Sequence, residues 1–157
     1  MDPFERAFDL TIGIEGGYTD DPHDPGGRTR YGISQRAYPQ EDIAALTLER
    51  AREIYRRDYW QAARCDFLPP QVAIQLFDCV VNHGINQGVR LFQRALGVAD
   101  DGIIGTVTLR RANLVAPDRL ARRLIAQRIT HWTSLKHWPI YGRGWARRAA
   151  TLLLEEA

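Results

Sequence analysis

The sequence predicts a mainly α-helical protein with a minor β element. Two patterns lead to this fold class. Apolar residues recur at spacings of three and four along most of the chain, whereas residues 18–33 are rich in glycine, proline and short polar side chains. The run at 72–81 is also apolar on too many sides for a surface helix. We therefore expect a helical bundle around this central helix, with a small β-hairpin or flap beside it.

The composition is ordinary for a globular chain of 157 residues, with 45% hydrophobic and 25% charged residues. This length is enough to bury a core without disulfides, so we expect one globular domain over 1–157. No apolar run approaches the length of about 18 residues that a membrane span needs, and the N-terminus lacks a basic region followed by an apolar one. We therefore expect neither a membrane span nor a signal peptide.

Charge is distributed unevenly along the chain. Residues 1–80 carry 9 Arg and 14 Asp or Glu, whereas residues 81–157 carry 12 Arg or Lys and 5 acids. An acidic first half and a basic second half suit a polyanionic target, although solvated helix faces are the alternative explanation for most of the arginines. Nucleic acid is the weakest of the possible targets, because the arginines form no dense basic run.

The two cysteines, Cys65 and Cys79, are too few to indicate a disulfide framework, although they could pair. Cys79 lies inside an apolar helical run, which favours a small buried side chain. Neither cysteine has His or Cys neighbours at the spacing of a zinc site. We expect no metal and no cofactor.

The first helix is expected to begin at Asp2-Pro3, a capping side chain followed by a proline at the first helical position. Glu15 continues its apolar stripe, and Gly16 and Gly17 are expected to end the helix. A carboxyl group on such a face is partly desolvated and lies at the negative end of the helix dipole. Both effects raise its pKa and favour a proton donor.

The remaining elements follow from turn residues and apolar spacing. Residues 18–33 predict a hairpin or irregular flap that turns near Gly26-Gly27, and Ser34 is expected to cap a short helix that stops before Pro39. Further helices are expected over 47–59, 72–84, 86–96, 105–113 and 117–132, and around 145–153. Pro139 is expected to interrupt the chain before the last of them.

Acidic residues and a hydroxyl group gather in the loop after the first helix. Glu15 is followed nine residues later by Asp24, and five residues after that by Thr29. One protonated carboxyl, one ionised carboxyl and a hydroxyl are the groups that hydrolysis of a glycosidic bond requires. The alternatives are structural, namely an ion pair of Glu15 with Arg28 or Arg30 and a turn role for Asp24.

The segment EGGYTDDPHDPGGRTRYGIS resembles the signature of the glycoside hydrolase family 108 lysozymes, N-acetylmuramidases that include phage endolysins. The later segment LFDCVVNHGINQGVRLFQRALGVADDGIIGTVTL is similar to the peptidoglycan-binding region that accompanies them, and HWPIYGRGWARRA is similar to their closing segment. The resemblance implies a lysozyme-like α+β fold. It also implies a catalytic lobe over 1–80 and a helical, peptidoglycan-binding-like lobe over 81–157, with no linker between them.

The resemblance implies hydrolysis of the β-1,4 bond between N-acetylmuramic acid and N-acetylglucosamine, with Glu15 as general acid. Asp24 and Thr29 would position or activate the attacking water, as in phage-type lysozymes, although the threonine of those proteins stands one position later. Asp20 and Asp21 compete with Asp24 as the second carboxylate. A loop aspartate that works with a threonine favours a bound water, so the hypothesis is an inverting mechanism.

The expected substrate-binding residues are Tyr31, Asn82, Trp138 and Tyr141. The resemblance implies that Asn82 faces the saccharide, where its amide would bond an N-acetyl group in both directions. Tyr31 either packs the flap or lines the cleft. Trp138 and Tyr141 flank Pro139 in an expected loop and would be exposed to the cleft, whereas Trp132 and Trp145 are expected in the core.

These inferences predict a monomeric muramidase that binds peptidoglycan strands and degrades the bacterial cell wall, most simply a phage lysis enzyme made in the host cytoplasm and acting in the periplasm after release. The alternatives are a lytic transglycosylase that gives 1,6-anhydro products and a non-catalytic peptidoglycan-binding protein. A further alternative places function in the basic C-terminal helix, where Arg143, Arg147 and Arg148 would contact an anionic membrane surface.

Overall fold

The computed structural model describes residues 2–13, 17–20 and 26–155. This part of the chain is mainly helical, with one two-stranded antiparallel sheet, which confirms the predicted fold class. The elements are α1 (Pro3–Thr11), β1 (Thr29–Arg30), β2 (Ile33–Ser34), α2 (Leu48–Tyr55), α3 (Pro70–His83), α4 (Ile85–Leu96), α5 (Thr106–Leu114), α6 (Pro117–Thr133) and α7 (Trp138–Glu155).

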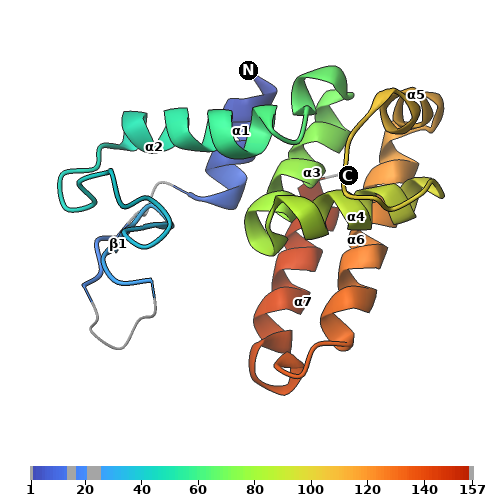
Figure 1. Cartoon of the computed structure of the whole chain (residues 1–157). Coiled ribbons are helices and arrows are strands. Elements are labelled where there is room, and N and C mark those ends of the chain that lie inside the picture. The colour runs from blue at the N-terminus through green and yellow to red at the C-terminus, as the bar shows by residue number, and fades with distance from the viewer. Residues whose placement is uncertain (1, 14–16, 21–25, 156–157) are drawn as a thin grey trace.

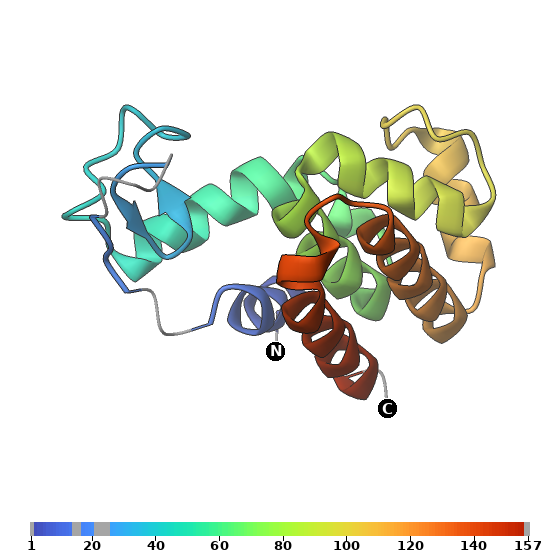
Figure 2. The same ribbon diagram turned by 90° about the horizontal axis from the view of Figure 1, so that it is seen from below.

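Figure 1 shows α2 reaching from the small sheet, at one end of the molecule, to the helical body at the other. The pair α6 and α7 projects from this body, and the view from below in Figure 2 shows the same separation between the sheet and the pair. α3 packs against α1, α4 and α6, so it is the central helix that its composition predicts. It spans the boundary between the two expected lobes, whose separate roles stay a prediction.

The first helix begins as predicted. The Asp2 side chain accepts a hydrogen bond from Phe4 N at 3.0 Å and caps α1. Phe4 and Phe8 are fully buried, and the Phe4 ring makes edge contacts with Trp60 (5.6 Å between centroids) and Phe77 (5.7 Å). Aromatic edge contacts of this kind add to the burial energy, and they fix α1 on α3.

The expected end of the first helix is wrong. α1 ends at Thr11, and Gly13 takes a positive φ of +73°, a left-handed conformation that favours glycine and ends a helix. The stripe therefore stops before Glu15. Glu15 and Gly16 lie outside the described residues, and Gly17 is exposed in an irregular segment.

Thr47 caps α2 as predicted, because its hydroxyl accepts a hydrogen bond from Arg50 N at 3.1 Å. The helix continues through a π-helical segment, Arg56–Gln61, which brings Trp60 into the core. The Trp60 indole donates to Asp66 at 2.6 Å, beside a short 3-10 turn at Cys65–Phe67. The buried indole thus keeps a hydrogen-bond partner while its ring packs against α1 and α3.

The central helix and α4 approach each other closely. A Cβ atom on Gly88 of α4 would lie 2.8 Å from Val80 Cα of α3, so only glycine permits this contact. Cys79 of α3 is fully buried, as predicted, and burial raises the pKa of its thiol to about 12. Cys65 is also buried, and both cysteines are free, so they do not pair.

The predicted hairpin is present, but its tight turn lies elsewhere. Strands β1 and β2 pair antiparallel, and Tyr31 and Gly32 form the turn between them with φ of +50° and +74°. The predicted turn near Gly26-Gly27 is wrong for this hairpin, although the chain does return there to form a bridge between Thr19 and Thr29. Ser34 ends a strand and begins a turn rather than the predicted short helix.

The helices α6 and α7 enclose a second, smaller cluster of buried residues, namely Ile125, Trp132, Ala149 and Leu152. Pro139 does not interrupt the chain, because it stands in the first turn of α7, where a proline lacks no needed hydrogen bond. Among the described residues, none of the helices is both long and apolar enough to cross a membrane.

Candidate active site

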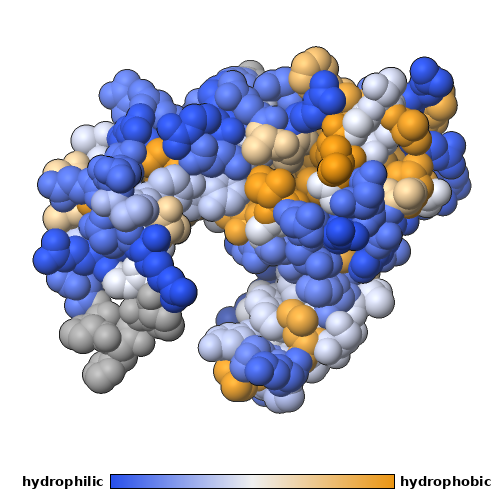
Figure 3. Space-filling model, viewed as in Figure 1, coloured by the Kyte–Doolittle hydropathy of each residue, from blue (hydrophilic) through white to orange (hydrophobic). Residues whose placement is uncertain are grey.

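The surface is hollowed between the end that carries the β-hairpin and the projecting end of α6 and α7, as Figure 3 shows. The sequence-predicted site residues that the structure describes belong to the two parts of the molecule that border this hollow. Thr29 and Tyr31 belong to the hairpin, whereas Asn82, Trp138 and Tyr141 belong to the helical body. Glu15, Asp21 and Asp24 lie outside the described residues.

Thr29 occupies the middle of the small sheet region. Its backbone N–H and C=O bond to Thr19 at 2.9 and 2.8 Å, and its side-chain hydroxyl donates to the Gly27 carbonyl at 3.1 Å. The hydroxyl is half-buried and retains its lone pairs, so it can still accept a hydrogen bond from a water. Its predicted role in positioning water stays a prediction.

Tyr31 is placed by the tight turn of the hairpin. Its backbone carbonyl accepts a hydrogen bond from the Tyr55 hydroxyl of α2 at 3.0 Å, which attaches the hairpin to the core. The neighbouring Gly32 is required, because a Cβ atom there would lie 2.6 Å from the same hydroxyl. The Tyr31 ring is half-buried, with the Arg30 guanidinium 5.4 Å from its centroid.

Asp20 is exposed and lies beside two polar neighbours. Its carboxylate is 3.4 Å from Arg28 Nε and accepts a hydrogen bond from the Tyr18 hydroxyl at 3.4 Å. Arg30, the other expected ion-pair partner of Glu15, donates to the Ala44 carbonyl at 2.8 Å. Both arginines therefore have partners that do not involve Glu15.

Asn82 is exposed in the last turn of α3. Its amide nitrogen donates to the Asp78 carbonyl oxygen at 2.7 Å and lies 3.4 Å from the Asp78 carboxylate. Its amide oxygen has no hydrogen-bond partner within the described ranges. Asn82 therefore keeps a free acceptor for an N–H group of a ligand, whereas its amide nitrogen already donates to the carbonyl and the carboxylate of Asp78.

Trp138 and Tyr141 lie in the first turn of α7, not in the predicted loop. Trp138 is half-buried. Its ring lies against Gly142 of the same helix, where a Cβ atom would be only 2.8 Å from the ring. Tyr141 is 55% exposed, and its ring centroid lies 5.8 Å from that of Trp145. Tyr141 is thus the more accessible of the two predicted platforms.

A row of stacked rings connects the end of α3 with the start of α7. His83 stacks on Trp132 at 5.5 Å, and Trp132 stacks on Trp145 at 6.0 Å. Trp145 in turn contacts Tyr141. Trp132 is a core residue as predicted, whereas Trp145 is only partly buried and packs against the same cluster. The row therefore connects His83, the neighbour of Asn82 in the sequence, with Tyr141.

The sequence analysis did not predict a buried charge cluster formed by Asp78, Arg128 and Arg148. Asp78 of α3 forms ion pairs with Arg128 of α6, at 2.7 Å, and with Arg148 of α7. Thr11, the last residue of α1, donates its hydroxyl to Asp78 at 3.1 Å, and its carbonyl accepts from Arg148 at 3.4 Å. The cluster ties the end of α1 to three other helices. Arg148 is therefore not part of a free basic face on α7.

The spacing of apolar residues in α6 could have indicated this cluster from the sequence. Arg128 stands four residues from both Leu124 and Trp132, on the apolar stripe, and Asp78 stands in the most apolar run of the chain. A buried charge of either sign needs a partner of the opposite sign. Two such charges on neighbouring buried helices therefore indicate a pair.

The cluster also sets the protonation of its members. Burial alone would raise the pKa of the Asp78 carboxyl, but Arg128 and Arg148 outweigh it and hold the pKa below its ordinary value. Burial and the nearby Arg128 charge lower the pKa of His83 from 6.5 to about 4. Arg128 Nε donates to His83 Nε2 at 3.4 Å, a contact that requires this nitrogen to be unprotonated. His83 is thus neutral near pH 7.

Within the described residues, no three His, Cys, Asp or Glu side chains lie close enough together to hold a metal ion. The parts of the molecule that border the hollow carry the Asn82 amide, the exposed Tyr141 ring and the Thr29 hydroxyl. These are groups that bind and orient a polar, ring-shaped ligand such as a sugar.

A family model described as glycosyl hydrolase 108 matches residues 8–84. Among solved structures, the chain is similar to one described as "Structure of Brucella abortus SagA", with 32% sequence identity and a TM-score of 0.85. The similarity covers 98% of this chain and 92% of that chain. No curated protein matches the sequence.

Proposed function

The chain belongs to the glycosyl hydrolase 108 family, a family of peptidoglycan-hydrolysing glycosidases, and we propose that it cleaves the β-1,4 bond between N-acetylmuramic acid and N-acetylglucosamine with Glu15 as general acid. The carrying observation is the family match over residues 8–84, which includes Glu15, Asp24 and Thr29 together. The hollow beside the hairpin supports the proposal, because a glycan strand needs an open groove.

In the proposed reaction, Glu15 gives its proton to the bridging oxygen as the bond from that oxygen to C1 of N-acetylmuramic acid breaks. A water attacks C1, and its proton passes to the second carboxylate, for which Asp24 is the first candidate and Asp20 and Asp21 are the alternatives. Thr29 orients the water through its free lone pairs. This is the inverting course, which requires the two carboxyl groups to lie about 6.5–9.5 Å apart rather than about 5 Å.

Side chains of α3 and α7 would hold the glycan. Asn82 offers its free amide oxygen to the N–H of an N-acetyl group. Tyr141 offers an exposed ring on which a sugar can stack, with Trp138 beside the same Trp145. The Asp78 cluster supports this arrangement, because it ties the end of α1, four residues before Glu15, to the helices that carry Asn82 and Tyr141.

Product analysis of digested peptidoglycan tests the reaction type. A muramidase exposes N-acetylmuramic acid reducing ends, whereas a lytic transglycosylase gives 1,6-anhydro ends that are lighter by one water. Transglycosylation needs no water-positioning carboxylate, so Asp24→Asn would then leave the rate unchanged. We expect reducing ends and a loss of rate in Asp24→Asn. Binding to cell walls without any new ends would instead indicate a non-catalytic peptidoglycan-binding protein.

The biological setting of the proposal is lysis of a bacterial cell by an enzyme that acts on the wall from the periplasmic side, most simply a phage lysis enzyme. Expression in the bacterial cytoplasm with and without an added export signal tests this setting. We expect lysis with the exported form. Intact cells in the presence of exported, folded and active enzyme would contradict a lytic role.

A further inference from the structure

A second pocket lies at the end of the molecule opposite the β-hairpin, where α4, α5 and α6 meet (Figure 1). Its volume is about 410 Å³, and it opens to solvent. The residues that line it are Arg94, Ala95, Leu96, Gly97, Arg111, Arg123, Ala126 and Gln127. None of these is acidic. Three guanidinium groups, each from a different helix, therefore border one concave site.

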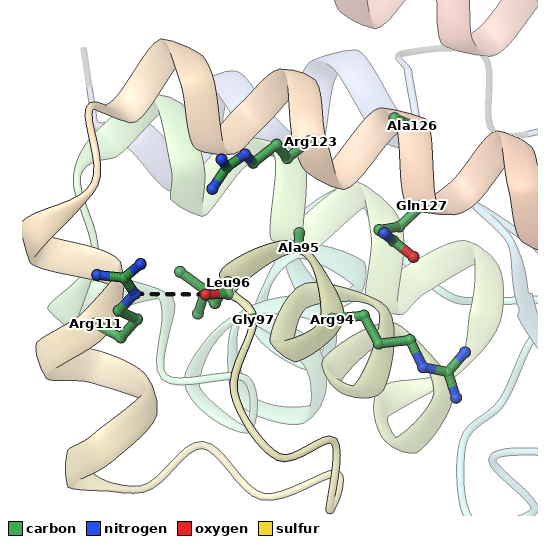
Figure 4. A pocket seen from close by; sticks show the side chains of 8 residues that line it. All are labelled: Arg94, Ala95, Leu96, Gly97, Arg111, Arg123, Ala126 and Gln127. Carbon is green, nitrogen blue, oxygen red and sulfur yellow. Dashed lines mark hydrogen bonds between the residues drawn. The ribbon is translucent and has the colours of Figure 1, made fainter.

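Figure 4 shows how these side chains lie. Arg111 and Arg123 stand on one side of the α4 end at Ala95–Gly97, and Arg94 and Gln127 stand on the other. The small side chains of Ala95 and Ala126, together with Gly97, leave the space between them open. A ligand placed there would meet Arg111 and Arg123 on one side and Gln127 on the other, because the Arg94 guanidinium points away from this space.

Only one of the three arginines has an acidic partner in the part of the chain that the structure describes. Arg94 Nε lies 2.6 Å from Asp100 Oδ2. Arg111 donates to the backbone carbonyl of Leu96 at 3.4 Å, and Arg123 makes no ion pair. The surrounding segment, residues 102–137, carries seven Arg or Lys and a single acid, Asp118. Two positive charges at the pocket therefore remain unneutralised.

The C-terminal end of α4 opposes an anion, because the carbonyl groups of a helix end carry partial negative charge. Much of this effect is already offset. Gly97 N donates to the Arg94 carbonyl and Val98 N donates to the Gln93 carbonyl, each at 3.1 Å. Arg111 covers the Leu96 carbonyl. The charge of the arginines then decides which ligand the pocket prefers.

We propose that this pocket binds a phosphate ester group. Two unneutralised guanidinium groups match the charge of about −1.5 to −2 on a phosphate monoester better than they match the single charge of a carboxylate. Guanidinium groups form paired, charge-assisted hydrogen bonds with phosphate oxygens. The volume also leaves room for a sugar or glycerol unit attached to the phosphate.

Such a site would attach the protein to an anionic component of the cell envelope while the hollow acts on a glycan strand. Two linked contacts raise the effective concentration of one site near its ligand without any new contact in the other. The phosphate has two possible sources, a lipid headgroup and a wall polymer. None of the residues that line the pocket takes part in the proposed reaction, so the inference does not depend on that reaction.

Binding of glycerol 3-phosphate to the full chain, followed by backbone NMR shifts, tests the site directly. We expect saturable shifts at Arg94–Gly97 and around Arg111 and Arg123. Acetate at the same concentration and ionic strength should give at least about ten-fold weaker binding. Equal binding of both anions would overturn the assignment of phosphate, and an absence of saturable shifts would overturn the site.

The paired variant Arg111→Gln with Arg123→Gln should bind glycerol 3-phosphate at least about ten-fold more weakly. Arg119→Gln is the matched control, because Arg119 is an exposed arginine of α6 that does not line the pocket. It should bind within about two-fold of the unchanged protein, since surface charges act weakly at a distance. Equal losses in both variants would indicate only a general effect of net charge and would overturn the proposal.

Sedimentation with two probes separates the sources. One probe is a vesicle that contains a lipid with a terminal phosphate, and the other is soluble poly(glycerol phosphate). Retention by either probe that the paired variant loses supports the site and identifies its source. If the paired variant is still retained by both probes, the result contradicts the proposed site. Peptidoglycan digestion is measured in parallel and should not change in either variant.

Discussion

The carboxylate of Asp78 and the guanidinium of Arg128 form an ion pair that is closed to solvent, with Oδ2 2.7 Å from Nη2 and side-chain exposures of 1% and 0%. The side chains of Arg148, Thr11 and Asn82 also bond to the carboxylate. A buried pair of this kind does not by itself add stability relative to an apolar pair, but removing one partner leaves a buried charge alone. The whole cluster therefore couples the packing of α1, α3, α6 and α7.

Replacing Asp78 by alanine should lower the free energy of unfolding by about 3–5 kcal/mol, because Arg128 would remain buried without its partner. Urea denaturation measures the change. The control is Asp118→Ala, which removes an exposed partner of Arg122 on α6 and should cost no more than about 1 kcal/mol. Similar losses in the two variants would contradict the role assigned to the cluster.

The stability of the protein should depend on His83 below neutral pH. Its folded pKa of about 4 lies below the ordinary value of 6.5, so the unfolded chain binds the proton more tightly. The contribution of His83 is therefore fully present above about pH 6.5 and is lost as the pH falls toward 4. Unfolding measurements from pH 7 to 4 should show a shallower decline for His83→Gln. The exposed His137, changed in the same way, should leave the decline as it is.

Gly32→Ala should destabilise the hairpin. The alanine would need a positive φ, at +74°, and its Cβ would lie 2.6 Å from the Tyr55 hydroxyl. We expect a cost of about 1–3 kcal/mol and a loss of peptidoglycan digestion, because the same turn holds Thr29. Gly144→Ala, in an open position on α7, should be neutral or stabilising by up to about 1 kcal/mol. Full activity and stability in Gly32→Ala would contradict this account of the turn.

Tyr141→Ala should weaken binding of peptidoglycan without unfolding the protein. The ring is 55% exposed, so its loss leaves the core intact while it removes a surface for stacking. We expect KM to rise roughly two- to ten-fold with little change in kcat or Tm. Ile140→Ala changes a neighbouring, 70% exposed side chain in the same turn and should leave KM unchanged. Equal effects of the two changes would argue against a specific role for Tyr141.

Much of the fold could be predicted because local rules governed it. Asp2 and Thr47 mark helix starts, and the apolar run at 72–81 forms the central helix. The errors arose where tertiary packing or one glycine decided the outcome. Gly13, rather than Gly16, ends α1, and Tyr31-Gly32 forms the turn because Tyr55 holds it against α2.

The site was predictable to a smaller extent. Tyr141 is exposed as expected, but Trp138 is partly covered because it begins α7 instead of lying in a loop. The partners of Asp78 are 50 and 70 residues away in the sequence, so no local pattern pairs them. Periodicity identifies which charges are buried, and only the packing of the helices shows which of them meet.

The central claim, that Glu15 donates the proton, is tested most directly by the rate at which Glu15→Gln releases reducing ends from peptidoglycan. We expect a loss of at least about 100-fold, because glutamine preserves the shape of the side chain but supplies no proton. Glu49→Gln, an exposed position on α2, should keep the unchanged rate. A Glu15→Gln enzyme that releases reducing ends as fast as the Glu49→Gln enzyme would contradict the account.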